Sequence, residues 1–165
     1  MELYDRKEPI HVPGRKQPHH YHLYRDTGSP LRVLGHYESP TGGGDTLSAG
    51  LDYMDCHVRE AIHEGMDCLY EGLVVSSDFK RIVALHNEGH PVIVLVMATP
   101  LEQCIASVEE RRRAKGNDKS LNTHATVMKH GLVSRHVPRF RAEGLRVEHL
   151  EREEAFLCVK EALGL

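Results

Sequence analysis

Short apolar runs alternate with helical apolar stripes from residue 31 onward. Residues 31–34 (LRVL) predict a strand that runs into the Gly-rich sequence GGGDT at residues 42–46. Apolar residues at helical spacing then predict a helix that begins at Leu47 and ends near Gly65. Residues 67–70 predict a short strand, and Ser76 or Ser77 caps a further predicted helix whose apolar positions run from Phe79 to Leu85.

The second half of the chain repeats this order. Residues 92–97 (VIVLVM) are continuously apolar, which is typical of a strand buried on both faces of a parallel sheet. Thr99, Pro100 and Glu102 predict the cap, first residue and capping box of a helix that ends in the basic residues 111–113. A helix over 123–136, a strand over 145–150 and a C-terminal helix marked by Phe156, Val159 and Leu163 complete the pattern. Such alternation predicts an α/β protein with a parallel sheet and helices on both faces.

The length and composition of the chain limit the classes of protein to which it can belong. At 165 residues the chain fits one domain, and its formal charge of −3 argues against a protein that mainly grips phosphate backbones non-specifically, while leaving room for a locally basic pocket. No apolar run approaches the roughly 20 residues of a membrane span. The four cysteines form no C-x-x-C pair, so we expect reduced core thiols in a cytoplasmic protein.

Histidines crowd the first segment, at positions 11, 19, 20 and 22. One interpretation is a polar surface hairpin over residues 1–30 that turns at Val12–Arg15. The other is a metal site, although no acidic partner or known spacing accompanies these residues. His86 and His90 have helical spacing, but Gly89 and Pro91 break the helix that an H-E-x-x-H zinc motif needs.

Candidate chemistry follows the ends of the predicted strands, because open α/β sheets bind ligands at the carboxyl ends of their strands. Asp45 and Glu71 are the carboxylates there, and the arginines at 111–113 could fold over the same edge. Asp45 or Thr46 could instead only cap the next helix, and the arginines could be a solvated helix end. The candidate substrate contacts are His36, Tyr37, Gly42, Gly43, Gly44 and Arg25.

The order of these motifs resembles the P-loop nucleoside and nucleotide kinases, especially small kinase-like proteins of bacteriophages. The residues concerned are VLGHY…GGGDT, then CLYEGL, then VIVLVMATPLEQCIASVEERRR, within residues 31–163. The resemblance implies a three-layer P-loop NTPase fold, with Glu71 near Mg²⁺, as in uridine-kinase-type enzymes. It also implies that Arg111, Arg112 and Arg113 belong to a lid over residues 111–122 that contacts the transferred phosphates.

One part of the family pattern is absent. No G-x-x-x-x-G-K-[ST] sequence occurs in the 165 residues, and residues 1–7 resemble the last turns of a helix. We therefore expect a fold that is N-terminally incomplete, without the first strand and its phosphate-binding loop. The strand at 92–97 would then carry unpaired backbone groups, and the chain alone would be poorly stable.

These observations favour an ATP- and Mg²⁺-dependent phosphotransferase that acts on a nucleoside, nucleotide or similar small acceptor, with nucleic acid less favoured as the acceptor. In it Glu71 holds Mg²⁺, Asp45 orients or deprotonates the acceptor, and the arginines neutralise developing charge. The alternatives are a non-catalytic nucleotide- or partner-binding module derived from the same fold, and a His-rich metal-binding protein.

Overall fold

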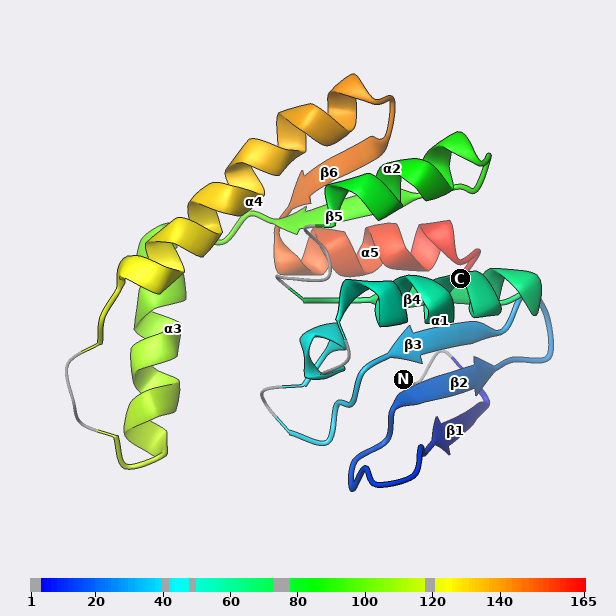
Figure 1. Ribbon diagram of the computed structural model, residues 1–165, viewed down its shortest axis with the longest axis horizontal. Coiled ribbons are helices and arrows are strands. Elements are labelled where there is room, and N and C mark those ends of the chain that lie inside the picture. Colours follow the sequence, from blue (N-terminus) through cyan, green and yellow to red (C-terminus); the bar gives the residue numbers. More distant parts are fainter. Residues whose placement is uncertain (1–3, 40–41, 48–49, 73–77, 118–120) are drawn as a thin grey trace. The chain divides into compact units, whose positions relative to one another are not determined.

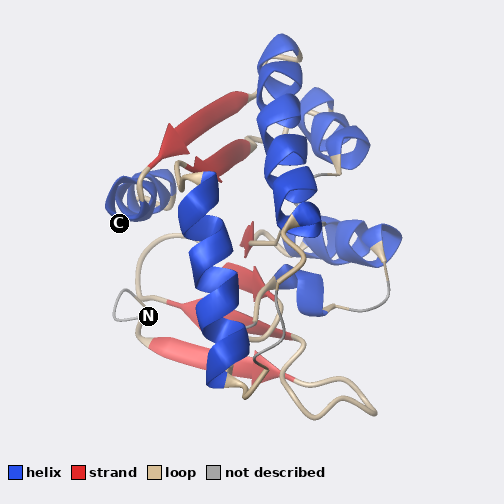
Figure 2. Cartoon of the chain, turned by 90° about the vertical axis from the view of Figure 1, so that its left-hand side faces the viewer, coloured by secondary structure: helices blue, strands red, loops and turns tan. Residues whose placement is uncertain are grey.

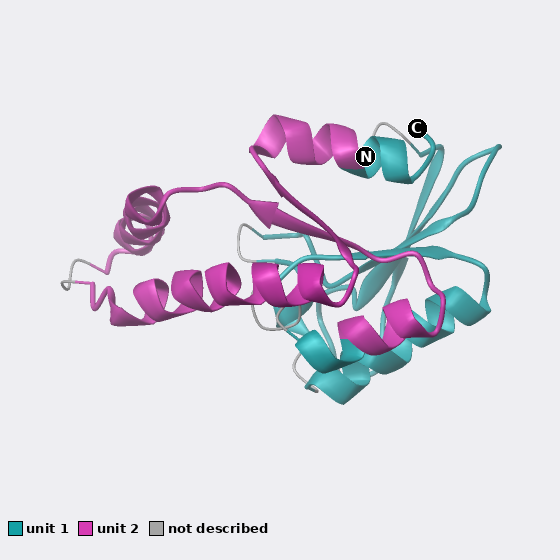
Figure 3. Cartoon of the chain, turned by 90° about the horizontal axis from the view of Figure 1, so that it is seen from above, with its two compact units in different colours: residues 1–81, 159–165 teal, residues 82–158 magenta. Residues whose placement is uncertain are grey.

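The computed structural model describes residues 4–39, 42–47, 50–72, 78–117 and 121–165 (Figure 1). The chain forms two compact units (Figure 3), where the sequence predicted one domain over 1–165. Unit 1 contains residues 1–81 and 159–165, and unit 2 contains residues 82–158. Ser76 and Ser77, the predicted helix cap, lie outside the described residues.

Unit 1 is built on a four-stranded sheet in the order β1-β2-β3-β4. The strands are β1 (Arg6–Ile10), β2 (His20–Tyr24), β3 (Leu31–Leu34) and β4 (Asp67–Tyr70). β1, β2 and β3 are antiparallel neighbours, and β3 and β4 are parallel, so this sheet is mixed. The parallel sheet was predicted from residue 31 onward, and the hairpin of β1 and β2 adds antiparallel strands beside β3. The predicted N-terminal hairpin is present. The predicted helix end at residues 1–7 is wrong for Arg6 and Lys7, which pair with β2, and residues 1–3 lie outside the described residues.

The helix of unit 1 covers this sheet with three buried side chains. It is α1 (Leu51–His63), which buries Met54, Val58 and Ala61. The predicted start at Leu47 is wrong, because a short 3₁₀ turn, η1 (Gly44–Thr46), precedes the helix and Gly50 occupies its N-cap without a side-chain cap. Asp45 and Thr46 therefore do not cap α1.

Unit 2 is built on two parallel strands, β5 (Ile93–Met97) and β6 (Arg146–Leu150). Its helices include the longest among the described residues, and Figure 2 draws all helices in blue. They are α2 (Phe79–Asn87), α3 (Leu101–Ala114), α4 (His124–Ala142) and α5 (Arg152–Ala162), with α2 and α5 each crossing the boundary between the units.

Three details of unit 2 differ from expectation. β5 is half-buried rather than buried, with Met97 46% exposed, because among the described residues it has one sheet neighbour, β6. α3 begins at Leu101 after an extended Pro100, so the predicted capping box of Thr99 does not form. In α5 the buried residues are Ala155 and Cys158, whereas the predicted anchor Phe156 is 54% exposed.

The cysteines are free thiols, as expected, but Cys56 is exposed rather than in the core. Among the described residues, no helix is long and apolar enough to cross a membrane.

Candidate functional site

The carboxyl ends of β3 and β4 lie side by side. Leu34 pairs with Tyr70 in the parallel register, so the next residues, Gly35 and Glu71, emerge at the same edge of the sheet. This edge is where open α/β sheets bind their ligands. The structure therefore brings the segment after β3 and the carboxylate after β4 to one place.

The segment after β3 folds back on itself as a loop, here called the glycine loop (residues 35–39 and 42–46). The Gly43 amide donates to the His36 carbonyl at 2.8 Å, and the Gly44 amide donates to the Glu71 carbonyl at 2.7 Å. Gly35 and Gly43 have φ of +94° and +97°, and a Cβ on Gly35 would overlap the Gly43 carbonyl. Glycine is needed at both positions because the backbone segments approach this closely in a left-handed conformation.

The two predicted carboxylate residues both belong to the surroundings of the glycine loop. A Cβ on Gly43 would stand 3.0 Å from Glu71 Oε1, so the Glu71 side chain lies directly against this glycine. Asp45 sits two residues further on in η1, and both carboxylate residues are exposed. Burial, and then the Glu71 carboxylate, raise the pKa of the Tyr37 hydroxyl, which therefore stays protonated and can donate a hydrogen bond.

Two side chains that the sequence did not single out hold this loop. Arg15 donates from both terminal nitrogens to Thr46, to its carbonyl at 3.1 Å and its hydroxyl at 3.3 Å. The Thr46 hydroxyl in turn donates to the Gly43 carbonyl at 2.6 Å. Tyr21 donates to Glu38 at 2.6 Å and accepts from the Tyr37 amide at 3.3 Å. No spacing signal links residues 31 positions apart, so these contacts were not visible in the sequence.

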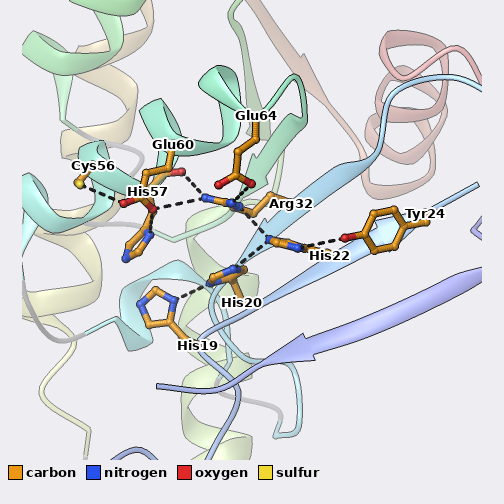
Figure 4. Close-up of polar contacts among 9 residues, drawn as sticks. All are labelled: His19, His20, His22, Tyr24, Arg32, Cys56, His57, Glu60 and Glu64. Carbon is orange, nitrogen blue, oxygen red and sulfur yellow. Dashed lines mark hydrogen bonds and ion pairs between the residues drawn. The ribbon is translucent and has the colours of Figure 1, made fainter. Parts of the chain in front are cut away.

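A second polar cluster lies beside β2 and α1 in the same unit (Figure 4). This histidine network comprises His19, His20, His22, His57, Arg32, Glu60 and Glu64. His19, His20 and Arg32 are only 1%, 6% and 3% exposed, so the predicted polar surface hairpin is wrong for His19 and His20. The bulk of α1 and the neighbouring strands covers them. His11 is exposed and His22 is half-buried.

The donor and acceptor roles of the neighbouring groups fix which ring nitrogens of neutral His19, His20 and His22 carry a proton. Arg32 Nε can only donate, so His22 Nε2 at 3.2 Å accepts. His20 Nε2, 3.1 Å from that nitrogen, must then donate, and its Nδ1 accepts from His19 Nδ1 at 2.8 Å. The hydrogen bonds therefore run in one direction from His19 to His22, and His19 Nε2 is a buried lone pair with no hydrogen-bond partner among the described residues.

The surroundings of His19 and His20 also favour the neutral form of both rings. Burial, followed by the neighbouring cations and histidines, lowers the pKa of His19 to about 4 and that of His20 to about 3. Arg32 is the charge at the centre of the network, and it donates to Glu64 at 2.7 Å and to the His57 carbonyl at 3.2 Å. The network thus neutralises a buried guanidinium with carboxylates that reach solvent.

The predicted site residue Arg25 does not lie at this sheet edge, and the predicted arginines 111–113 belong to unit 2. Arg25 follows β2 at the amino end of β3, the opposite end from Gly35, and its guanidinium donates to the Leu163 carbonyl at 2.5 Å. It therefore holds the C-terminal segment of unit 1. Arg111, Arg112 and Arg113 form the last turn of α3 in unit 2, where Arg111 donates to the Ser107 carbonyl at 3.1 Å.

The donor chemistry at the glycine loop fits a hard cation. Among the described residues no group of three or more His, Cys, Asp and Glu side chains is placed to hold a metal ion. Mg²⁺ does not need such a cage, since it is usually bound by one or two carboxylates together with water and substrate phosphates. Glu71 and Asp45 are the carboxylates that could do so here.

Comparison with known proteins gives the class. Over 164 residues the chain is 43% identical to a protein of Pseudomonas phage PaMx11 named 5-hmdU DNA kinase, a match that covers 99% of this chain and 86% of the phage protein. No protein-family profile and no solved structure matches. The chain is thus a relative of a kinase, and at this identity and coverage it belongs to the family of that phage kinase.

Proposed function

We propose that the chain transfers the γ-phosphoryl group of ATP to the hydroxymethyl oxygen of 5-hydroxymethyldeoxyuridine (5-hmdU) in DNA. The observation that carries this proposal is the match to the phage 5-hmdU DNA kinase along nearly the whole chain. The geometry of the glycine loop supports it, because two carboxylates and a glycine-lined backbone meet at one sheet edge.

The proposed step is an in-line displacement. The hydroxymethyl oxygen attacks the γ-phosphorus, a new O–P bond forms, the bond from phosphorus to the β–γ bridging oxygen breaks, and ADP leaves. The hydroxyl proton passes to the Asp45 carboxylate. Mg²⁺, when bound, neutralises charge on the phosphates.

Each residue of the glycine loop has a role in this proposal. The Glu71 carboxylate would hold Mg²⁺, while Gly42, Gly43 and Gly44 would let the acceptor approach the backbone. His36 and Tyr37 would contact the base, and the protonated Tyr37 hydroxyl is suited to donate to a uracil carbonyl. Arg111, Arg112 and Arg113 would supply positive charge to the phosphates.

We propose the three-layer P-loop kinase fold for this function. The parallel pairs β3–β4 and β5–β6, each followed by a helix, support it.

The test uses a duplex oligonucleotide with one 5-hmdU, with 5′ ends already phosphorylated and 3′ ends lacking a hydroxyl, so that the base carries the reactive alcohol. Incubation with γ-labelled ATP and Mg²⁺ should label this duplex and leave a duplex with thymine at the same position unlabelled. Digestion to nucleosides should place the label on the modified base. Equal labelling of both duplexes, or labelling only of the free nucleoside, would overturn the DNA acceptor.

A second candidate is a module that binds the modified DNA without turnover. The absence of a G-x-x-x-x-G-K-[ST] sequence from the 165 residues favours it. Labelling and a binding titration of the same two duplexes separate the two functions. The module would label neither duplex and would bind the 5-hmdU duplex more tightly than the thymine duplex.

A further inference from the structure

Positive charge is concentrated in one stretch of an acidic chain. Residues 111–141 contain nine Lys or Arg and one Asp, whereas the whole chain carries a formal charge of −3. The rest of the chain is therefore strongly acidic. The overall charge conceals a cationic segment within unit 2, which includes the last turn of α3 and nearly all of α4.

α4 is the 19-residue helix of this segment, and it includes no Asp or Glu. In α1, by comparison, acidic residues lie on the same helix as the cation: Arg59 pairs with Asp55 at 2.9 Å. The positive charge of α4 has no carboxylate on its own helix to oppose it.

The cations of α4 are also presented to solvent. Phe140 is its only buried residue. His124, Arg135 and Arg139 are all exposed, and their spacing of eleven and four residues places them on one face of the helix. Met128 belongs to the same face and is 51% exposed. We call this surface (His124, Met128, Arg135, Arg139) the basic face of α4.

We propose that the basic face of α4 binds the phosphate backbone of duplex DNA. This inference rests on the proposed function, which makes DNA the substrate. DNA offers the complementary surface, since a duplex carries one negative charge about every 1.7 Å along its axis. Met128, with its flexible apolar side chain, can lie against a deoxyribose between two phosphate contacts.

Salt dependence gives the proposal a quantitative form. The logarithm of the association constant for B-DNA falls with the logarithm of salt concentration by about 0.9 for each phosphate neutralised. Replacing two phosphate-binding arginines with glutamine should therefore make the slope shallower by about 1.8, and should weaken binding at 0.1 M salt by roughly 10- to 60-fold.

The experiment measures fluorescence anisotropy of an unmodified 20-base-pair duplex between 50 and 200 mM salt, for the wild type and for Arg135→Gln/Arg139→Gln. The matched control is Lys80→Gln/Arg152→Gln, which removes the same charge from exposed positions outside residues 111–141. The α4 variant should show the weaker binding and the shallower slope, with the control close to wild type. Circular dichroism melts of both variants check that the fold is kept.

Other outcomes overturn the proposal. Equal salt slopes for wild type and α4 variant would show that the basic face does not touch phosphate. A wild-type dimer that the α4 variant converts to monomer, without change in DNA affinity, would assign this face to a second copy of the chain. The unmodified duplex separates this result from the proposed function, because DNA binding through α4 is measured whether or not phosphate is transferred to 5-hmdU.

Discussion

His19 Nδ1 lies 2.8 Å from His20 Nδ1, with both rings buried, so one of the two nitrogens must carry the proton and the other must accept it. The direction is set at the far end of the network by Arg32, which can only donate to His22. A proton added to His20 Nδ1 would face the N–H of His19 Nδ1, so two donors would oppose each other. It would also give His20 a positive charge near the Arg32 guanidinium.

This arrangement predicts loss of stability in mild acid. In the unfolded chain both histidines take up protons near pH 6.5, whereas in the folded chain burial delays uptake to about pH 4 for His19 and about pH 3 for His20. Between these limits the unfolded state binds more protons, so the free energy of unfolding falls as pH falls. The slope is on the order of 1 kcal/mol per pH unit for each histidine.

Urea unfolding between pH 7 and pH 4.5 measures this slope. His20→Gln should flatten it, because glutamine does not titrate, while His63→Gln, at an exposed position, should leave it unchanged. The same slope in wild type and His20→Gln would show that the buried rings do not titrate differently on unfolding.

Stability should be far more sensitive to substitution of Arg32, which is 3% exposed, than to substitution of Arg59, which is half-buried in the same unit. Arg32→Lys keeps the charge but loses the planar fork that reaches Glu64, the His57 carbonyl and His22 together. We expect the free energy of unfolding to fall by about 2–4 kcal/mol, since the buried ammonium leaves acceptors unmatched. Arg59→Lys, in a half-buried i,i+4 pair with Asp55, should cost less than about 1 kcal/mol. Similar losses in urea denaturation for the two variants would contradict a central role for Arg32.

The close packing of Gly35 can be tested against Gly14, which also has a positive φ but has empty space around the position of an added Cβ. Gly35→Ala places a methyl group into the Gly43 carbonyl at a φ of +94°, so it adds a steric clash to backbone strain. Gly14 has a φ of +78° with nothing within 4 Å of the added Cβ, so Gly14→Ala measures strain alone, about 1 kcal/mol. Gly35→Ala should lose at least about 2 kcal/mol more and should abolish phosphoryl transfer. Equal losses in thermal melts would show that the loop does not close on Gly35.

The local elements of the second half were predictable because each has its own periodic signal. The strand at β5, the strand at β6 and the Ile82 and Leu85 face of α2 all follow from residues close together in sequence. It was also predictable that the glycine loop and Glu71 lie at the same edge of the sheet, since parallel strands bring their carboxyl ends to one edge. The sequence therefore predicted Asp45 and Glu71 as residues of one site.

The rest depends on partners distant in sequence. Residues 6–10 carry no strand pattern of their own, with Pro9 among them, and become β1 because β2 offers a register. Burial of His19 and His20 depends on α1, whose Glu60 and Glu64 compensate Arg32 from 28 and 32 residues away. The basic face of α4 was obscured by a net charge summed over the whole chain and by a helix predicted to end at His136, before Arg139.

Glu71→Gln tests the mechanism while leaving the fold intact. The Glu71 backbone carbonyl holds the Gly44 amide and is unchanged in glutamine, and the side chain is exposed, so the melting temperature should stay within a few degrees. Phosphoryl transfer to the 5-hmdU duplex should fall by at least about 100-fold, because a neutral amide holds Mg²⁺ less well than a carboxylate. Raising the Mg²⁺ concentration should recover part of the rate.

Glu102→Gln, which replaces an exposed glutamate in the first turn of α3, is the matched control and should keep wild-type turnover and Mg²⁺ dependence. Full activity of Glu71→Gln at low Mg²⁺ would remove Glu71 from metal binding, and would leave Asp45 as the carboxylate of the site.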